Sequence, residues 1–158
     1  MYYLCSLGCN IKPQQHVPQA IDELIQFTSP ITCSSFIYTI PVDMNSANHF
    51  VNGLFYFTND LPAKTIKTHF NHLEIVHGRD RQDPLSSIKD RVLDLDILAS
   101  SNNWAAIACA SLPSYLLELH SELIFNHCVN HQTKFHFNIG KLQLGHRTTT
   151  INRNPGPG

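Results

Sequence analysis

The first 98 residues contain strand-like and helix-like segments in an order that is compatible with only a few folds. Four segments are rich in β-branched and aromatic residues or alternate apolar with polar residues, as strands do. Two others repeat apolar residues every three or four positions, as helices do. The strand-like segments are 2–7, 31–40, 50–58 and 92–98, and the helical segments are 17–27 and 60–78. The order is therefore strand, helix, strand, strand, helix, strand.

This order predicts an α+β domain with an antiparallel sheet and both helices on one face. It is the ferredoxin-like βαββαβ pattern. The later segments predict a C-terminal extension, with a helix over 113–125 and a hairpin over 132–144. We expect residues 1–147 to form a single domain. We expect residues 148–158, which end in Asn-Pro-Gly-Pro-Gly, to be a disordered tail.

The ends of the two helices carry local signals. Pro18 suits the first turn of the 17–27 helix, where a missing amide hydrogen costs little. Asp60 can cap the second helix, and Pro62 lies near its start. Gly78 is expected to end that helix in the left-handed conformation, which glycine adopts without steric cost.

Composition and charge exclude several classes of protein. The 158 residues are 42% hydrophobic and 15% charged, which predicts a packed globule rather than a disordered chain. The formal net charge of −1 argues against general attraction to nucleic acid or to a membrane surface. Five cysteines without framework spacing, and a start without a signal-peptide pattern, predict a cytoplasmic protein with free thiols. We expect a monomer that binds neither nucleic acid nor membrane.

Two acidic residues lie in the last strand-like segment. Asp94 and Asp96 are two positions apart, so their side chains point to the same side of a strand, about 7 Å from each other. A divalent cation between them removes their repulsion, and oxygen ligands favour magnesium over zinc. The alternative is an ordinary strand whose polar side faces solvent. The pair alone leaves both interpretations open.

Four cationic residues precede this acidic pair. They lie between the second helix and the last strand: Arg79, Arg81, Lys89 and Arg91. A polyphosphate requires such a combination, because a metal neutralises some of its oxygens and guanidinium groups bind others. The alternative is a solvated loop whose cations pair with Asp80, Asp83 and Asp90.

Glycine-rich phosphate loops are absent from the sequence. It contains neither G-x-x-x-x-G-K-[ST] nor G-x-G-x-x-G, which argues against a P-loop or Rossmann enzyme. Any phosphate site must therefore be built from side chains and metal.

Five segments match, in order, the motifs of one enzyme family. Leu7–Asn10 is close to L-G-S-N, Ser34–Pro41 follows, and Phe50–Gly53 is similar to [FY]-L-N-x. Leu73–Arg81 is similar to I-E-x-x-x-G-R-x-R, and Arg91–Leu98 to R-T-L-D-L-D-I-L. Over residues 2–98 the chain thus resembles the 6-hydroxymethyl-7,8-dihydropterin pyrophosphokinases of folate biosynthesis. The last two segments are the most specific.

The resemblance implies a ferredoxin-like fold and an ATP-dependent pyrophosphokinase. Such an enzyme transfers pyrophosphate from ATP to the pterin hydroxymethyl group and releases AMP. The resemblance implies two magnesium ions held by Asp94 and Asp96, with Arg79 and Arg91 stabilising charge on the transferring phosphoryl groups. The implied ATP-binding residues are Asn71, Glu74, Arg81, Lys89, Ile97 and Tyr115. The implied pterin-binding residues are Thr39, Val42, Phe50 and Asn52.

The pterin residues also have a physical rationale. A pterin is flat with polar edges, so an aromatic ring such as Phe50 and a two-sided amide such as Asn52 can orient it. The alternatives are an ordinary core position for Phe50 and a turn cap for Asn52. No strong general base for the hydroxymethyl is evident in the sequence, and positioning with electrostatics can carry most of phosphoryl transfer.

The chain departs from the family pattern on the ATP side. Where the family has P-H-x-x-x-x-x-R, this chain has Ser114 in place of the histidine and His120 in place of the arginine. Arginine is permanently charged and bidentate, whereas histidine is largely neutral at pH 7, so we expect a weaker hold on phosphate. One alternative is therefore a catalytically weakened homologue that binds pterin or nucleotide and regulates another process. A second is a ferredoxin-like RNA-binding or interaction module, which the neutral charge disfavours.

Overall fold

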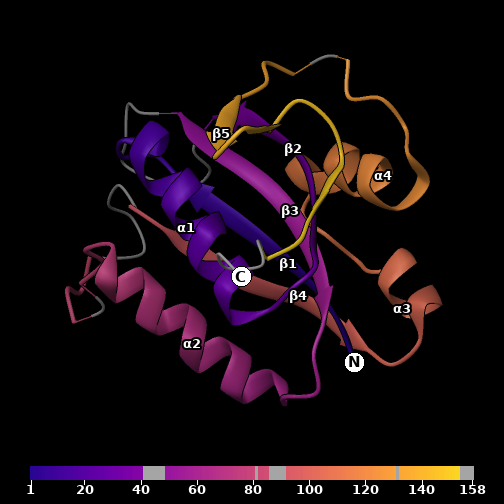
Figure 1. Ribbon diagram of the computed structural model, residues 1–158, viewed down its shortest axis with the longest axis horizontal. Helices are drawn as coiled ribbons and strands as arrows, with labels where there is room; N and C mark the ends of the chain where they lie inside the picture. The colour runs from indigo at the N-terminus through magenta and orange to yellow at the C-terminus, as the bar shows by residue number, and fades with distance from the viewer. Residues whose placement is uncertain (41–48, 81, 86–91, 131, 154–158) are drawn as a thin grey trace.

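A five-stranded antiparallel sheet forms the centre of the protein (Figure 1). The computed structural model describes residues 1–40, 49–80, 82–85, 92–130 and 132–153. The strand order is β4-β1-β3-β2-β7. The strands are β1 (Tyr2–Cys9), β2 (Ile31–Thr39), β3 (Phe50–Thr58), β4 (Asp94–Ser101) and β7 (Thr149–Ile151). The first four have the ferredoxin-like order, which confirms the predicted fold class.

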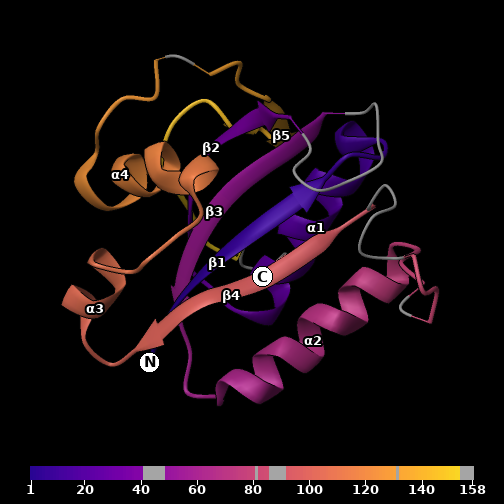
Figure 2. The same cartoon turned by 180° about the vertical axis from the view of Figure 1, so that it is seen from behind.

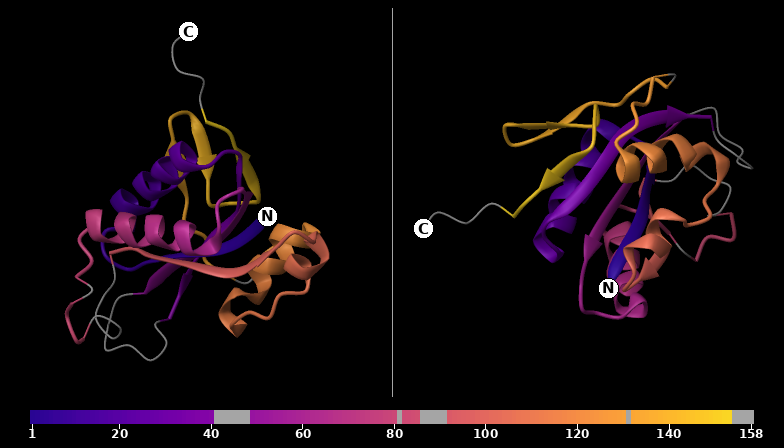
Figure 3. Two further views of the ribbon diagram at one scale, coloured as in Figure 1. Left: turned by 90° about the horizontal axis from the view of Figure 1, so that it is seen from below. Right: turned by 90° about the vertical axis from the view of Figure 1, so that its right-hand side faces the viewer.

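Two long helices cover one face of this sheet, called the first face below. They are α1 (Pro13–Phe27) and α2 (Ala63–Val76), and the left view of Figure 3 shows both on the same side of the strands. Alternate residues of β1 point toward them, so Tyr3, Cys5 and Leu7 are fully buried in one large apolar cluster. The strands and helices are held together chiefly by this burial of apolar surface.

The opposite side, called the second face, is covered only in part. The helical elements there are α3 (Trp104–Ala108), η1 (Ser114–Leu116) and α4 (Leu117–Phe125). They bury a smaller cluster that includes Leu4, Ile37 and Leu54 from the sheet. Figure 2 shows α3 and α4 displaced to one side of β1 and β4. The C-terminal end of β1 and the start of β4 lie beyond this cluster.

Several predicted boundaries need correction. The first helix begins at Pro13, not near Val17, because Lys12 adopts a left-handed conformation that turns the chain into it. Pro18 therefore lies inside the helix. The second helix starts after Pro62 without a side-chain cap, so the expected capping by Asp60 is wrong. Gly78 has a φ of 105°, as expected of the residue that ends this helix.

The C-terminal part is more ordered than expected. The predicted hairpin is present as β5 (Phe137–Ile139) and β6 (Leu142–Leu144). The expected disordered tail from residue 148 is wrong in its first part, because Thr149–Ile151 pairs with Ile31–Cys33 as the last strand of the sheet. Residues 154–158 lie outside the described part of the chain. None of the helices in the described residues is long and apolar enough to cross a bilayer.

Candidate active site

Three side chains from neighbouring strands surround Gly8 on the second face. In the sheet register, Gly8 of β1 lies between Asn52 of β3 and Asp94 of β4. A Cβ atom at Gly8 would lie 3.1 Å from Asn52 Oδ1, 3.7 Å from Phe50 Cδ1 and 3.9 Å from Asp94 Cβ. Because glycine has no side chain, the backbone of β1 forms the floor between these groups. Two of the predicted pterin residues, Phe50 and Asn52, therefore adjoin the predicted metal residue Asp94.

The amide of Asn52 has a defined orientation. Its Nδ2 donates a hydrogen bond to the hydroxyl of Thr39, the residue that pairs with Phe50 at the end of β2. This leaves Asn52 Oδ1, a hydrogen-bond acceptor, on the side of Gly8. Asn52 and Phe50 are both 8% exposed, so each is largely held by its neighbours.

Arg79 is paired with Asp94, a contact that the sequence did not predict. Its Nη1 donates to Asp94 Oδ1 at 2.8 Å and lies 3.3 Å from Glu74 Oε2. Its side chain is 14% exposed. Its Nε is buried without a hydrogen-bond partner among the described residues. The left-handed turn at Gly78 precedes this residue directly.

Glu74 connects α2 to the edge strand β4. It is fully buried, and its Oε1 accepts a hydrogen bond from the backbone N–H of Leu95 at 2.8 Å. Since Oε2 lies against Arg79, both carboxylate oxygens contact groups of the protein. This places Glu74 behind the site, where it positions Arg79 and β4.

Asp96 has a partner that the sequence analysis missed. Lys67 of α2 places its Nζ 3.0 Å from Asp96 Oδ1 and 2.7 Å from the carbonyl oxygen of Leu95. Lys67 is seven positions before Glu74, so the two side chains lie on the same side of α2. The seven-residue spacing is visible in the sequence. It identifies Lys67 as a site residue only when the side of α2 that carries Glu74 is known to face β4.

Other predicted residues lie around this centre or outside the described chain. Asn71 lies on α2 between Lys67 and Glu74 and is partly buried. The side chain of Ile97 packs against the first-face cluster. Tyr115 lies on η1 and is 43% exposed. The residues that lie outside the described part of the chain are Val42, Arg81, Lys89 and Arg91.

His120, which occupies the place of an arginine in the family pattern, is buried between two helical elements. It is 7% exposed and its Nε2 is 3.1 Å from the carbonyl oxygen of Ile107, so it ties α4 to α3. Ser114 begins η1. The histidine at this position therefore has a packing role in the structure.

A chain of hydrogen bonds reaches the end of α2 from α1. His16 Nδ1 lies 2.9 Å from His77 Nδ1, and His77 Nε2 lies 3.1 Å from both carboxylate oxygens of Glu23. Burial, aided by His77 and Lys12, lowers the pKa of His16 below its usual range. His77 immediately precedes Gly78 and Arg79, so these side-chain contacts lie next to the backbone from which Arg79 extends.

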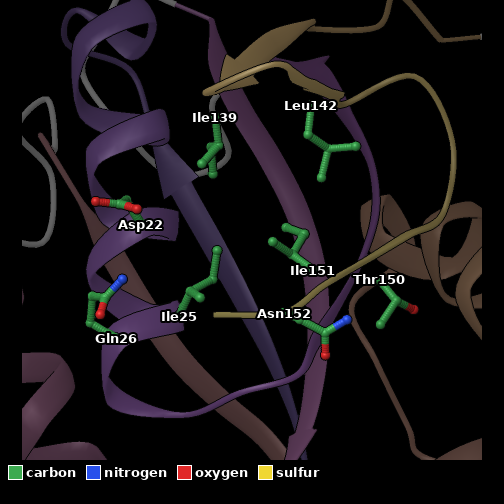
Figure 4. Close-up of a pocket in the computed structure, with 8 residues that line it drawn as sticks. All are labelled: Asp22, Ile25, Gln26, Ile139, Leu142, Thr150, Ile151 and Asn152. Atoms are coloured by element: carbon green, nitrogen blue, oxygen red, sulfur yellow. The ribbon is translucent and has the colours of Figure 1, made fainter. Parts of the chain in front are cut away.

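A separate cavity of about 210 Å³ lies on the first face (Figure 4). Ile25 of α1 and Ile139 and Ile151 of the C-terminal strands face it, while Asp22 and Gln26 lie along α1. The sheet separates it from Gly8 and the carboxylates. It is therefore not part of the candidate active site.

The carboxylate end offers oxygen donors, which are the ligands that a hard cation prefers. Among the described residues, no group of three or more histidine, cysteine, aspartate or glutamate side chains could share a metal ion. Magnesium does not need such a cage, since it is commonly held by one or two carboxylates together with water and substrate phosphates. The two aspartates fit that requirement, and the donor set contains no soft ligand.

Comparison with known proteins agrees with this geometry. A search of curated proteins gave no significant match. The family model described as 7,8-dihydro-6-hydroxymethylpterin-pyrophosphokinase (HPPK) matches residues 4–148, which run from β1 to beyond β6. The chain belongs to this family, and by that membership it is an ATP-dependent pyrophosphokinase that acts on a pterin in folate biosynthesis.

Proposed function

We propose that the chain transfers pyrophosphate on the second face of its sheet, with the pterin over Gly8 and the triphosphate over Asp94 and Asp96. The observation that carries this proposal is the convergence of Asn52, Phe50 and Asp94 around Gly8. This convergence supports binding of the pterin and the triphosphate next to each other, which transfer of a group between them requires.

At the pterin end, three features support recognition of a flat, edge-polar ring. Gly8 allows a ring to approach the backbone of β1 closely. Asn52 Oδ1 accepts a ring N–H, because Nδ2 is already committed to Thr39. Phe50 supplies an apolar contact at the rim of this floor.

At the phosphate end, Asp94 and Asp96 would hold magnesium, with two ions expected. Magnesium bound there would neutralise charge on the triphosphate. Arg79 keeps the Asp94 carboxylate in place and brings a positive charge next to the phosphates. Asn71 lies on the same side of α2, where it can contribute a polar contact to ATP.

The reaction then proceeds by displacement at the β-phosphorus of ATP. The hydroxymethyl oxygen forms a bond to this phosphorus and loses its proton, while the bond to the α–β bridging oxygen breaks and AMP leaves. The protein's part is to align the two reactants and to stabilise the developing negative charge, which accounts for most catalysis of phosphoryl transfer.

A second candidate is a weakened homologue that binds pterin without efficient turnover. The observation that favours it is His120, whose ring is engaged with Ile107 and not with the site. It differs from the first candidate only in the rate of AMP release.

The test is AMP formation from ATP and 6-hydroxymethyl-7,8-dihydropterin, with and without magnesium. Asp94→Asn removes the charge at the centre of the site, so we expect kcat to fall roughly 10²- to 10³-fold. Asp60→Asn changes an exposed aspartate remote from Gly8 and should leave kcat unchanged. Pterin binding by calorimetry without AMP formation in the unaltered protein would establish the second candidate instead. Equal activity of Asp94→Asn and the unaltered protein would remove Asp94 from the mechanism.

A further inference from the structure

We propose that Lys67 is a built-in competitor of the divalent cation at Asp96, and so sets how tightly the site binds metal. This inference rests on the proposed function of Asp94 and Asp96. Its starting point is the position of the Lys67 ammonium group, which contacts both Asp96 Oδ1 and the Leu95 carbonyl oxygen.

The edge of the sheet explains why Lys67 lies there. β4 has β1 on one side and no further strand of the described chain on the other. The backbone N–H and C=O of Leu95 point to this free side, where they bind Glu74 and Lys67 of α2. An unpaired edge carbonyl is a strong acceptor. The ammonium group is thus held by a backbone atom as well as by the carboxylate.

Each of the two aspartates therefore forms an ion pair with a basic side chain of the protein. Asp94 has Arg79 at 2.8 Å, and Asp96 has Lys67 at 3.0 Å. The two pairs differ in how firmly they are fixed. Arg79 is 14% exposed and also contacts buried Glu74, whereas the Lys67 side chain is 36% exposed and Asp96 is 49% exposed. Lys67 is therefore the cation that can leave.

A metal ion that binds Asp96 must displace or share this ammonium group. A lysine is a strongly hydrated point charge on a flexible stem, so it can move away when a doubly charged ion arrives. Its positive charge also repels the arriving ion over a few ångströms. Removal of the charge should therefore favour metal binding. If Lys67 only supported β4, removal of its charge would not increase the affinity for metal.

The experiment is a titration of the full chain with Mn²⁺, which replaces Mg²⁺ as a paramagnetic probe, with free ion measured by electron paramagnetic resonance. It is carried out with the metal alone and again with a non-hydrolysable ATP analogue. Lys67→Met keeps the stem and removes the charge, so we expect Mn²⁺ to bind about three- to tenfold more tightly in both conditions.

Two matched variants separate charge from structure. Lys67→Arg retains the positive charge and should bind Mn²⁺ as the unaltered protein does. Lys64→Met removes an exposed lysine from the same helix, three positions away, and should have no effect. Unchanged Mn²⁺ affinity in Lys67→Met, or equal gains in Lys67→Met and Lys64→Met, would overturn the proposal.

Failure of this inference is distinguishable from failure of the proposed function. Asp96→Asn should weaken Mn²⁺ binding both by itself and when it is combined with Lys67→Met. If it does so while Lys67→Met changes nothing, the metal site remains and only the competition is disproved. If Asp96→Asn has no effect in either combination, the metal site itself is wrong.

Discussion

The same three strands, β1, β3 and β4, present two chemically different faces. On the first face, Tyr3, Cys5 and Leu7 of β1 are buried under α1 and α2 in a continuous apolar cluster. On the second face, Leu4 is buried near α3 and α4, but Gly8 lies in one row with Asn52 and Asp94. One face is filled with apolar side chains, and the other has a stretch lined by a glycine and polar groups.

This difference indicates that the first face mainly stabilises the fold and the second face mainly binds ligands. A filled apolar face contributes stability and tolerates little change in volume. A face with a glycine floor and hydrogen-bonded polar groups contributes binding, and a small addition there affects a ligand more than it affects the fold. Gly8 of β1 lies on the second face and Gly53 of β3 on the first face. Replacing each glycine with alanine therefore tests the binding role of one face and the packing role of the other.

The largest effect is expected for Gly53→Ala, on the first face. A Cβ atom at Gly53 would lie within the ring of Phe36, which is completely buried. The ring cannot move without disturbing the cluster, so we expect a loss of about 1–3 kcal/mol in the free energy of unfolding. Urea unfolding measures it. The AMP-forming activity of the fraction that remains folded should be preserved, and full stability of the variant would show that the first face is less tightly packed than described.

A smaller and different effect is expected for Gly8→Ala, on the second face. The added methyl group meets Asn52 Oδ1 at 3.1 Å and makes ordinary contact with Phe50. The unfolding free energy should change by less than about 1 kcal/mol, since alanine restricts the unfolded chain and the contact is only slightly tight. The pterin affinity should fall about tenfold, which corresponds to roughly 1.4 kcal/mol. Calorimetry with the pterin, and separately with an ATP analogue, distinguishes this from general damage.

The fold was largely predictable from the sequence because its signals are local. Alternation and helical spacing predicted the four main strands and two main helices in their correct order. The elements that were missed lack a local signal. Thr149–Ile151 becomes a strand only because it pairs with Ile31–Cys33, more than a hundred residues earlier. The short helix α3 spans only Trp104–Ala108 and carries too few residues for a periodic pattern.

The sequence predicted which residues form the candidate site better than it predicted which side chains they contact. The spacing of Asp94 and Asp96 predicted that both would share one side of β4, and the register and contacts place Asp94 beside Gly8. The pairing of Asp96 with Lys67 depends on which side of α2 faces the edge of the sheet, which no local pattern gives. The roles of the site residues in binding pterin, ATP and magnesium remain predictions that the variants above test.

The smallest effect concerns the helices of the first face and their link to Arg79 through His16 and His77. Burial lowers the pKa of His16 in the folded state, so the unfolded chain binds more protons than the folded one as the pH falls below about 6.5. Stability that is present above that pH is therefore lost progressively in acid. His16→Gln should flatten this dependence in urea unfolding between pH 8 and pH 5, although His69, whose pKa burial also lowers, leaves a residual slope. His49→Gln, a change of an exposed histidine, serves as the control. Activity at pH 8 should be unchanged in His16→Gln, because His16 is neutral there; a loss of activity at pH 8 would mean that the helix layer helps to position Arg79, and the two faces would then be less independent than their packing suggests.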